Sequence, residues 1–279
     1  MIPRVLSIAG TDPTGGAGVL ADMKTFSALG VYGMGVLTAV VAQNTRGVQQ
    51  VQVLPAGLVT AQLDSVFDDI DVDAVKIGML ADADQVRAVA AVLRTRRPPH
   101  VVLDPVLVAT SGDRLAGADV VTALRDELIP LVDLITPNLP EAAALLGADQ
   151  AVDEAGMAAQ LGALGRLGCA VLLKGGHLTG AAGSPDLLLT GPGAVPVRLD
   201  APRVPTSSTH GTGCALSSAL AALRPRHPGW VETAAAAKRY VTGAVAAAGL
   251  LHVGSGHGPI HHLHLLWAGA GPALTGTTP

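Results

Sequence analysis

Short apolar runs rich in Val, Ile and Leu alternate along this 279-residue chain with longer stretches of helical spacing. The first run, RVLSIAG at residues 4–10, predicts a buried strand, and residues 17–30 after it predict a helix that ends at Gly30. This alternation is typical of strands joined by crossover helices. It therefore predicts a mainly parallel sheet covered by helices.

Further apolar runs predict the rest of the sheet, at residues 35–43, 72–80, 100–108, 132–138 and 169–176. Residues 186–190 and 194–201, joined by a Gly-Pro turn, predict an antiparallel hairpin at a sheet edge. No low-complexity linker divides the chain, so one domain is expected over residues 1–279, with a mobile end from about residue 267.

Charge and composition exclude several classes of protein. A formal net charge of -4 argues against a nucleic-acid binder, which needs a basic surface. Polar residues interrupt every apolar run before it reaches membrane-spanning length, and the most apolar stretch, residues 233–251, carries Lys238 and Arg239. With two cysteines and no secretory signal at the start, the chain is expected to be cytoplasmic and free of membranes.

Glycine-rich or polar segments follow the predicted strands. They are GTDPTGGAG at 10–18, QNT at 43–45, KIGML at 76–80, DPV at 104–106, TPNLPE at 136–141 and KGGH at 174–177. Ligands of open parallel sheets bind beyond the carboxyl ends of the strands. These segments are therefore expected to meet at one edge of the sheet and to form one site there.

The segment at 10–18 favours a loop that approaches a ligand closely, because glycine allows tight turns and leaves helix amides free. A plain strand-to-helix turn explains the glycines equally well. Asp12 can accept hydrogen bonds from a polar substrate or cap the turn. The sequence has neither a P-loop motif nor the dinucleotide fingerprint, so both of those nucleotide sites are excluded.

Residues 210–214 place a cysteine where a helix begins. Gly211, Thr212, Gly213 and Cys214 present successive backbone N–H groups at that helix start, which predicts a pocket for an oxyanion or a phosphoryl group. The same field is expected to lower the pKa of Cys214 from its ordinary value of about 8.5 and to make its thiolate available. Cys169 lies inside a predicted strand and is expected to be buried and inert.

Other polar residues at the strand ends suggest phosphate and metal chemistry. Lys174 closes a buried strand and is expected to face an anion, and Asp104 is the best single carboxylate for metal or phosphate work. Asn138 and Glu141 can reach a hydrated Mg²⁺ or its phosphate, or can simply cap their helix. Four histidines, His257, His261, His262 and His264, can bind zinc, although packing of a C-terminal segment explains them more simply.

Taken together, these segments resemble a known family along most of the chain, from about Val5 to His262. The matching motifs are AGTDPTGGAGVLADMKTFSALGVYG, VVAQNT, VKIGML, LDPVLVATSGDRL, TPNLPEA, LLKGGH, HGTGCALSSALAA, AKRYVTGAV and GHGPIHH. They are similar to the hydroxymethylpyrimidine and phosphomethylpyrimidine kinases of thiamine biosynthesis, in the ribokinase-like superfamily. The motifs are specific because they are many and occur in the family's order and spacing.

The resemblance implies a three-layer α/β/α fold with a mainly parallel central sheet, ATP as phosphoryl donor, Mg²⁺, and a homodimer. It also implies two successive reactions on 4-amino-5-hydroxymethyl-2-methylpyrimidine, in which first the alcohol and then the resulting monophosphate is phosphorylated. Thr110 stands where the family often has a lysine, which puts one nucleotide or loop contact in doubt.

The same resemblance suggests the role of each site residue. Gln43 would recognise the pyrimidine, since an amide can pair with a ring nitrogen and the exocyclic amine at once. The other pocket positions would be Gly10, Asp12, Ala17, Met79 and Val106. Lys174 and Lys238 would hold phosphates, and Asp104, Asn138 and Glu141 would serve Mg²⁺ and the triphosphate.

Cys214 occupies a position where many ribokinase relatives carry Asp. In a loose phosphoryl-transfer transition state the acceptor proton leaves late, so Cys214 is expected to act as general base for the alcohol. The phosphate acceptor of the second step needs little base.

Three other functions remain open from the sequence. A pyridoxal kinase of the same superfamily is the nearest alternative. A catalytically silent pyrimidine sensor would not need Cys214, Lys174, Asp104 or an anion pocket. A cysteine-nucleophile hydrolase would need a histidine partner for Cys214, and His210 is a weak candidate because it precedes the glycine turn.

Overall fold

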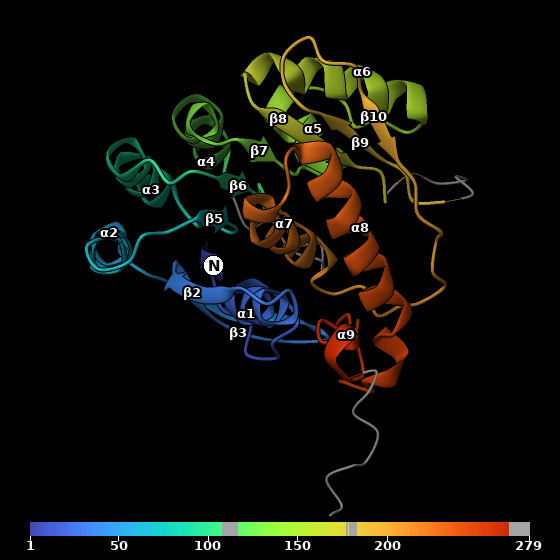
Figure 1. The fold of residues 1–279 in the computed structure, drawn as a ribbon, viewed down its shortest axis with the longest axis horizontal. Helices are drawn as coiled ribbons and strands as arrows, with labels where there is room; N and C mark the ends of the chain where they lie inside the picture. The colour runs from blue at the N-terminus through green and yellow to red at the C-terminus, as the bar shows by residue number, and fades with distance from the viewer. Residues whose placement is uncertain (108–116, 177, 179–182, 268–279) are drawn as a thin grey trace, which may run out of the picture.

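An eight-stranded sheet forms the centre of the molecule in the computed structural model, which describes residues 1–107, 117–176, 178 and 183–267 (Figure 1). The strand order is β10-β9-β8-β7-β6-β5-β1-β2. The strands are β1 (Arg4–Ala9), β2 (Tyr32–Leu37), β5 (Ala74–Ile77), β6 (Val101–Leu103), β7 (Leu134–Ile135), β8 (Ala170–Lys174), β9 (Asp186–Leu189) and β10 (Val197–Leu199). Six of these strands run parallel to one another, namely β1, β2, β5, β6, β7 and β8. This confirms the predicted, mainly parallel sheet.

Helices cover both faces of this sheet. They are α1 (Gly18–Ala28), α2 (Ala56–Phe67), α3 (Ala83–Arg96), α4 (Ala118–Ala123), α5 (Leu139–Leu146), α6 (Glu154–Leu164), α7 (Thr212–Leu223), α8 (Trp230–Ala246) and the short α9 (His264–Trp267). Helices α2 to α6 pack with strand residues such as Leu6 and Ile8, and helices α1, α7 and α8 pack with alternate residues such as Val5. The two cores confirm the three-layer α/β/α fold.

The side chains of these cores are almost all aliphatic. Phe26 is the largest of the fully buried residues, and the face covered by α7 is built mainly from alanine and leucine. Small residues allow helices to approach the sheet and one another closely, which suits a chain with 2% aromatic residues. Within the described part of the chain, no helix is both long and apolar enough to span a bilayer.

The predicted hairpin at residues 186–201 is confirmed. β9 pairs antiparallel with β8, and β10 pairs antiparallel with β9 through Leu188 and Val197. This hairpin extends the sheet at the edge where Lys174 ends β8. The predicted mobile end after about residue 267, and Thr110, lie outside the described residues.

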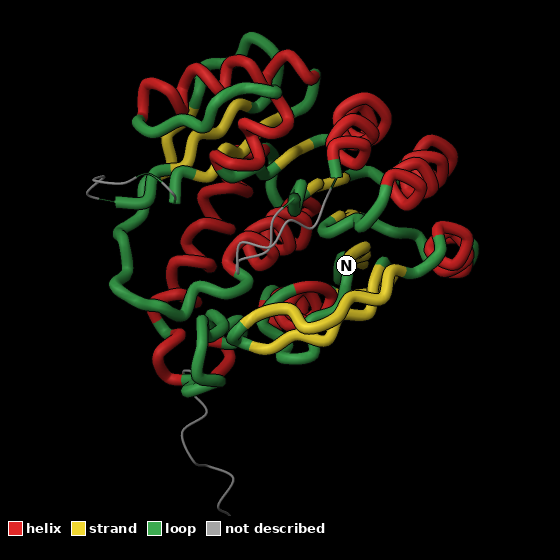
Figure 2. The backbone as a smooth tube through the Cα atoms, turned by 180° about the vertical axis from the view of Figure 1, so that it is seen from behind, coloured by secondary structure: helices red, strands yellow, loops and turns green. Residues whose placement is uncertain are grey.

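The prediction of one strand over residues 35–43 was wrong. β2 ends at Leu37, and β3 (Ala39–Asn44) leaves the main sheet to pair antiparallel with β4 (Gly47–Val53) in a separate two-stranded sheet (Figure 2). The break falls at Thr38, whose N–H donates to Ala9 and whose hydroxyl donates 2.8 Å to the carbonyl of Met79. These bonds turn the chain across the carboxyl ends of β1 and β5, so that β3 borders the site.

Candidate active site

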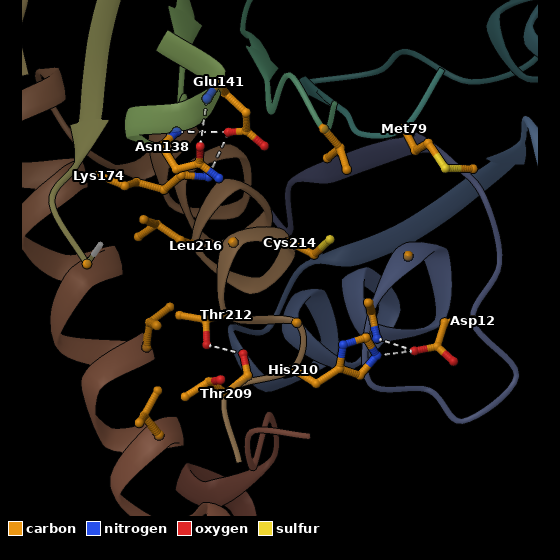
Figure 3. Close-up of a pocket in the computed structure, with 18 of the residues that line it drawn as sticks. Asp12, Met79, Asn138, Glu141, Lys174, Thr209, His210, Thr212, Cys214 and Leu216 are labelled. Carbon is orange, nitrogen blue, oxygen red and sulfur yellow. Dashed lines mark hydrogen bonds and ion pairs between the residues drawn. The ribbon is translucent and has the colours of Figure 1, made fainter. Parts of the chain in front are cut away.

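One cavity of about 680 Å³ lies at the carboxyl ends of the parallel strands. Its wall includes residues from each of the six segments that follow the predicted strands, so the prediction that they meet at one site is confirmed. The predicted site residues that line it are Gly10, Asp12, Ala17, Gln43, Met79, Val106, Asn138, Glu141, Lys174, Gly211, Thr212, Gly213, Cys214 and Lys238. Figure 3 shows part of this wall. Asp104 does not belong to it and is only 2% exposed.

Asp12 organises the glycine-rich loop between β1 and α1. One carboxylate oxygen accepts hydrogen bonds from the N–H and the hydroxyl of Thr14, at 2.9 and 2.8 Å. The other accepts from the Ala17 N–H at 2.9 Å and contacts His210 Nε2 at 2.7 Å. Burial alone would raise the pKa of Asp12, but hydrogen bonds from His210 and Thr14 outweigh it and lower the pKa to about 2. Asp12 therefore caps the turn as an ionised group.

The N-termini of α1 and α7 meet at Cys214. The residue before α7, Gly211, has a φ of 82°, and a Cβ there would collide with the carbonyl of Gly16, so only glycine fits this approach of the two loops. The backbone N–H of Gly18, at the start of α1, lies near the Cys214 thiol and lowers its pKa slightly. The N-termini of two helices thus approach each other at the cavity, and the start of α7 in particular favours a bound anion.

The expectation of a lowered pKa for Cys214 was wrong. Burial raises the pKa of the Cys214 thiol, and the carboxylates of Asp22 and Asp104 raise it further, while the ammonium of Lys76 lowers it. The pKa therefore rises, because the loss of hydration and the two nearby carboxylates raise it by more than the helix N-terminus and Lys76 lower it. Cys169 is 7% exposed, as expected of an inert residue, and burial raises its pKa to about 12.

Lys174 connects two carboxylates at the edge of the cavity. Its Nζ lies 2.9 Å from Asp104 Oδ1 and 3.8 Å from Glu141 Oε2. Asp104 also accepts hydrogen bonds from the hydroxyls of Thr136 at 3.0 Å and Ser217 at 3.3 Å. Burial opposes ionisation of Asp104, but Lys174 and Lys76 lower its pKa, so it stays charged.

Glu141 and Asn138 form a capping box at the start of α5. The Glu141 N–H donates to the Asn138 side chain, and the Asn138 N–H donates to Glu141 Oε2, both at 2.8 Å. The capping alternative for this pair therefore holds in the structure. Burial is the main cause that raises the pKa of Glu141 to about 7, and Lys174 only partly offsets it.

Lys238 reaches the cavity from α8. Its ammonium donates 2.6 Å to Asp186 Oδ2 and 2.7 Å to the carbonyl of Ser184. Asp186 in turn accepts from the Gly175 N–H at 3.0 Å. Sequence reasoning did not single out Asp186, which lies directly opposite Lys174 in the sheet. The usable signal in the sequence was an Asp at the start of the apolar run DLLL.

A second charged group that the sequence analysis missed lies beneath Cys214. Lys76 pairs with Asp22 in the fully buried interior, and both residues are 0% exposed. The signal in the sequence was a lysine inside an otherwise apolar strand, AVKI. A buried lysine needs a partner.

The histidines near the C-terminus hold the loops of the site together. The N–H of His257 donates 2.9 Å to the carbonyl of Thr45, and Tyr240 donates its hydroxyl to the carbonyl of His262 at 2.7 Å. The described residues contain no group of three His, Cys, Asp or Glu side chains placed to hold a metal ion. The packing interpretation of this segment is the one that the contacts support.

Comparison with known proteins gives consistent results. The family model described as phosphomethylpyrimidine kinase matches residues 12–261. The chain is 57% identical over 265 residues to the hydroxymethylpyrimidine/phosphomethylpyrimidine kinase of Salmonella typhimurium, covering 95% of this chain and 98% of that one. It is 56% identical over 265 residues to the protein of the same name from Escherichia coli, with the same coverage.

Solved structures with the same fold include two kinds of kinase. A Bacillus subtilis pyridoxal kinase in complex with ADP has a TM-score of 0.86 and 33% identity, over 94% of this chain and 98% of that one. A phosphomethylpyrimidine kinase from Clostridium difficile has a TM-score of 0.75 and 36% identity, over 86% and 98%. Both pyrimidine and pyridoxal kinases therefore occur among the structural neighbours.

Proposed function

The chain belongs to the phosphomethylpyrimidine kinase family, and from that membership we propose that it uses ATP to phosphorylate 4-amino-5-hydroxymethyl-2-methylpyrimidine and then the monophosphate product, in thiamine biosynthesis. The relatives with 57% and 56% identity carry both activities in their names. The observation that carries the proposal is the single cavity in which an anion pocket at the start of α7 adjoins Lys174, with Gln43 in the same wall.

The proposed phosphoryl site is formed by backbone amides and two lysines. The N–H groups of Gly211, Gly213 and Cys214 face the transferred group, whereas the N–H of Thr212 donates to the carbonyl of Thr209 at 3.2 Å. Amides fixed at a helix N-terminus stabilise negative charge without having to reorganise. A Cβ at Gly213 would lie 3.3 Å from Lys174 Nζ, so this lysine stands directly beside the amides. Lys238 is the second lysine of the proposed phosphoryl site, and its ion pair with Asp186 keeps its side chain extended towards the cavity.

Asp104 and Glu141 are proposed to hold Mg²⁺ together with the phosphates. Oxygen ligands suit this ion, which keeps several of its waters and binds proteins through one or two carboxylates. Burial raises the pKa of Glu141 to about 7, and the nearby carboxylate of Asp104 raises it further. A divalent cation beside these two acids would favour their ionised forms and would supply charge neutralisation to the phosphates of ATP.

Cys214 is proposed as the proton acceptor in the first step. The hydroxyl proton moves to the thiolate as the oxygen bonds to phosphorus and the bond from phosphorus to the bridging oxygen of ATP breaks. Burial makes the thiolate scarce but more basic, and the nearby ammonium of Lys76 reduces the cost of forming it. In the second step the acceptor is already an anion, so positioning by the amides and lysines suffices.

The test is a coupled assay of ATP consumption with Mg²⁺, in which the hydroxymethylpyrimidine, its monophosphate and pyridoxal are offered separately and product masses are measured. Phosphorylation of both pyrimidines well above pyridoxal is the expected result. Turnover of pyridoxal alone would favour the pyridoxal kinase alternative. Binding of the pyrimidine without any turnover would favour the silent sensor.

We also propose that the chain forms a homodimer, as members of the family that it resembles do. Light scattering coupled to size-exclusion chromatography should give twice the chain mass of 27.9 kDa. A mass of one chain at micromolar concentration would reject this proposal.

A further inference from the structure

His210 stands at the junction of three loops of the cavity. It immediately precedes the glycine turn of α7, and its side chain is 12% exposed in the cavity wall. Nε2 of its ring lies 2.7 Å from Asp12 Oδ2 and 3.5 Å from the side-chain nitrogen of Gln43. In Figure 3 the imidazole lies between Asp12 and the pocket, with its other ring nitrogen turned away from Asp12.

The carboxylate of Asp12 fixes which ring nitrogen carries the proton. With a pKa of about 2, Asp12 is ionised at neutral pH and can only accept hydrogen bonds. Nε2 must therefore be the protonated nitrogen that donates to Asp12, and in a neutral imidazole Nδ1 then presents a lone pair. Among the described residues, none hydrogen-bonds to Nδ1, so in the neutral ring this nitrogen is free to accept a hydrogen bond from a ligand.

Gln43 faces His210 from the inner side of β3. Val41 and Gln43 both line the cavity, whereas Ala42 and Asn44 are exposed, so the alternation of the strand places Gln43 on the cavity side. At this point the pairing with β4 skips Gln49, which is the extra residue of a β-bulge.

The backbone on both sides of this pair is held by one segment. The His210 N–H donates to the carbonyl of Gly258 at 3.1 Å, and the Ile260 N–H donates to the carbonyl of His210 at 3.3 Å. One residue before Gly258, the N–H of His257 donates to the carbonyl of Thr45, two residues past Gln43. The two side chains are therefore positioned before any substrate arrives, which reduces the entropy lost on binding.

The substrate of the proposed function has one more donor than Gln43 can use. An amide that pairs with a ring nitrogen and the exocyclic amine accepts only one of the two amine hydrogens. The 4-amino group lies on the ring carbon next to the one that carries the hydroxymethyl group, and that hydroxyl must face the start of α7, directly after His210. The second hydrogen is left for another acceptor in the pocket.

We propose that His210, held by Asp12 as an acceptor through Nδ1, receives the second hydrogen of the 4-amino group and thereby selects the aminopyrimidine over pyridoxal. This inference rests on the proposed function and adds the residue that sets its specificity. Pyridoxal has an aldehyde at the corresponding ring position. The aldehyde oxygen is a hydrogen-bond acceptor, so it would face the Nδ1 lone pair without forming a hydrogen bond. Sites built to bind a substrate N–H discriminate strongly against analogues that lack it.

The binding test uses the full chain and two pyrimidines that differ only in the amine. Calorimetry without ATP measures the affinity of 4-amino-5-hydroxymethyl-2-methylpyrimidine and of the same compound without the 4-amino group, for the wild type, His210→Phe and His210→Asn. We expect the wild type to prefer the amine about 100-fold or more, His210→Phe to reduce that ratio about 10-fold, and His210→Asn to retain part of it. His227→Phe, remote from the cavity, is the matched control and should keep the wild-type ratio.

A ratio unchanged in His210→Phe would overturn the inference, as would an equal loss of affinity for both compounds, which indicates a merely structural role. Imidazole ¹⁵N shifts of His210 in the wild type give a readout that needs no variant. The Nδ1 resonance should move when the aminopyrimidine binds and should stay in place with the deaminated compound. A protonated Nδ1 in the free protein would reject the proposal.

The kinetic arm separates this inference from the proposed function. Wild-type phosphorylation of the aminopyrimidine shows that the function holds, and the ratio of kcat/KM for that substrate to kcat/KM for pyridoxal should then fall about 10-fold or more in His210→Phe. If the wild type fails to phosphorylate the pyrimidine, the function fails. If it succeeds and the ratio does not change, only the role of His210 fails.

Discussion

Lys76 Nζ lies 2.8 Å from Asp22 Oδ2 beneath the cavity, and neither side chain has any exposed surface. The hydroxyls of Ser7 and Ser218 each donate to Asp22 at 2.6 Å. Ser218 follows Cys214 by one turn of α7, so this buried cluster supports the helix that carries the anion pocket. Two hydroxyls and one ammonium thus donate to the Asp22 carboxylate, so that its buried negative charge is compensated.

Removing one charge of this pair should destabilise the protein strongly. Lys76→Met leaves the Asp22 carboxyl group buried without its ammonium partner, and we expect the free energy of unfolding to fall by about 3–5 kcal/mol. Urea denaturation followed by circular dichroism measures it. The double variant Lys76→Met, Asp22→Leu should recover part of the loss, whereas Arg125→Ala, which breaks an exposed pair with Asp126, should have no measurable effect. Equal losses in the single and double variants would contradict this account.

Cys214→Ala should damage the first phosphorylation more than the second. Loss of a general base lowers kcat for the alcohol by about 10²- to 10⁴-fold, and the phosphate acceptor should lose less than about 10-fold. Separate single-substrate assays of the two steps make the comparison. Cys169→Ala removes the other thiol of the chain, which lies just before β8 and does not line the cavity, and should leave both steps unchanged. Equal losses in both steps of Cys214→Ala would reject the division of roles.

Gly213→Ala should weaken ATP binding. The added Cβ would lie 3.3 Å from Lys174 Nζ and 3.6 Å from Asp104 Oδ2, so it would crowd the proposed phosphate site. We expect KM for ATP to rise about 10-fold or more. Gly162→Ala is the matched control, because its Cβ meets nothing within 4 Å in α6, and alanine there should raise stability by roughly 0.5–1 kcal/mol. An unchanged KM in Gly213→Ala would remove Gly213 from the phosphate site.

Lowering the pH should destabilise the folded protein, because Asp12 becomes protonated and loses the hydrogen bonds that favour its ionised form. Its folded-state pKa of about 2 lies below the ordinary value of 3.8, so its contribution is fully present above pH 4 and is lost as pH falls towards 2. The shift corresponds to about 2 kcal/mol. The difference in unfolding free energy between wild type and Asp12→Asn should therefore shrink by that amount between pH 5 and pH 2. Asp71→Asn, at an exposed position, should show a difference that does not depend on pH in this way.

Much of the fold followed from local pattern. The period of the apolar residues separates strands from helices, so the sheet, the covering helices and the edge hairpin were predictable from it. The failure at residues 35–43 has a clear cause, because β2 and β3 are both apolar and only Thr38, bonded to Ala9 and Met79, divides them. Those partners are distant in sequence, so no local pattern indicates the break.

The sequence by itself determined the layers of the fold, the edge at which the site lies and the residues that gather there, because strand direction and glycine turns are local properties. Only the tertiary structure decided how charge is distributed within the site. It placed Cys214 near Asp22 and Asp104. It also paired Lys76 and Lys238 with acids that the sequence analysis had not singled out, and it joined Asp12 to His210 across 198 positions. A pKa, a tautomer and an ion pair depend on desolvation and on distances between segments remote in the chain, and these exist only once the chain has folded.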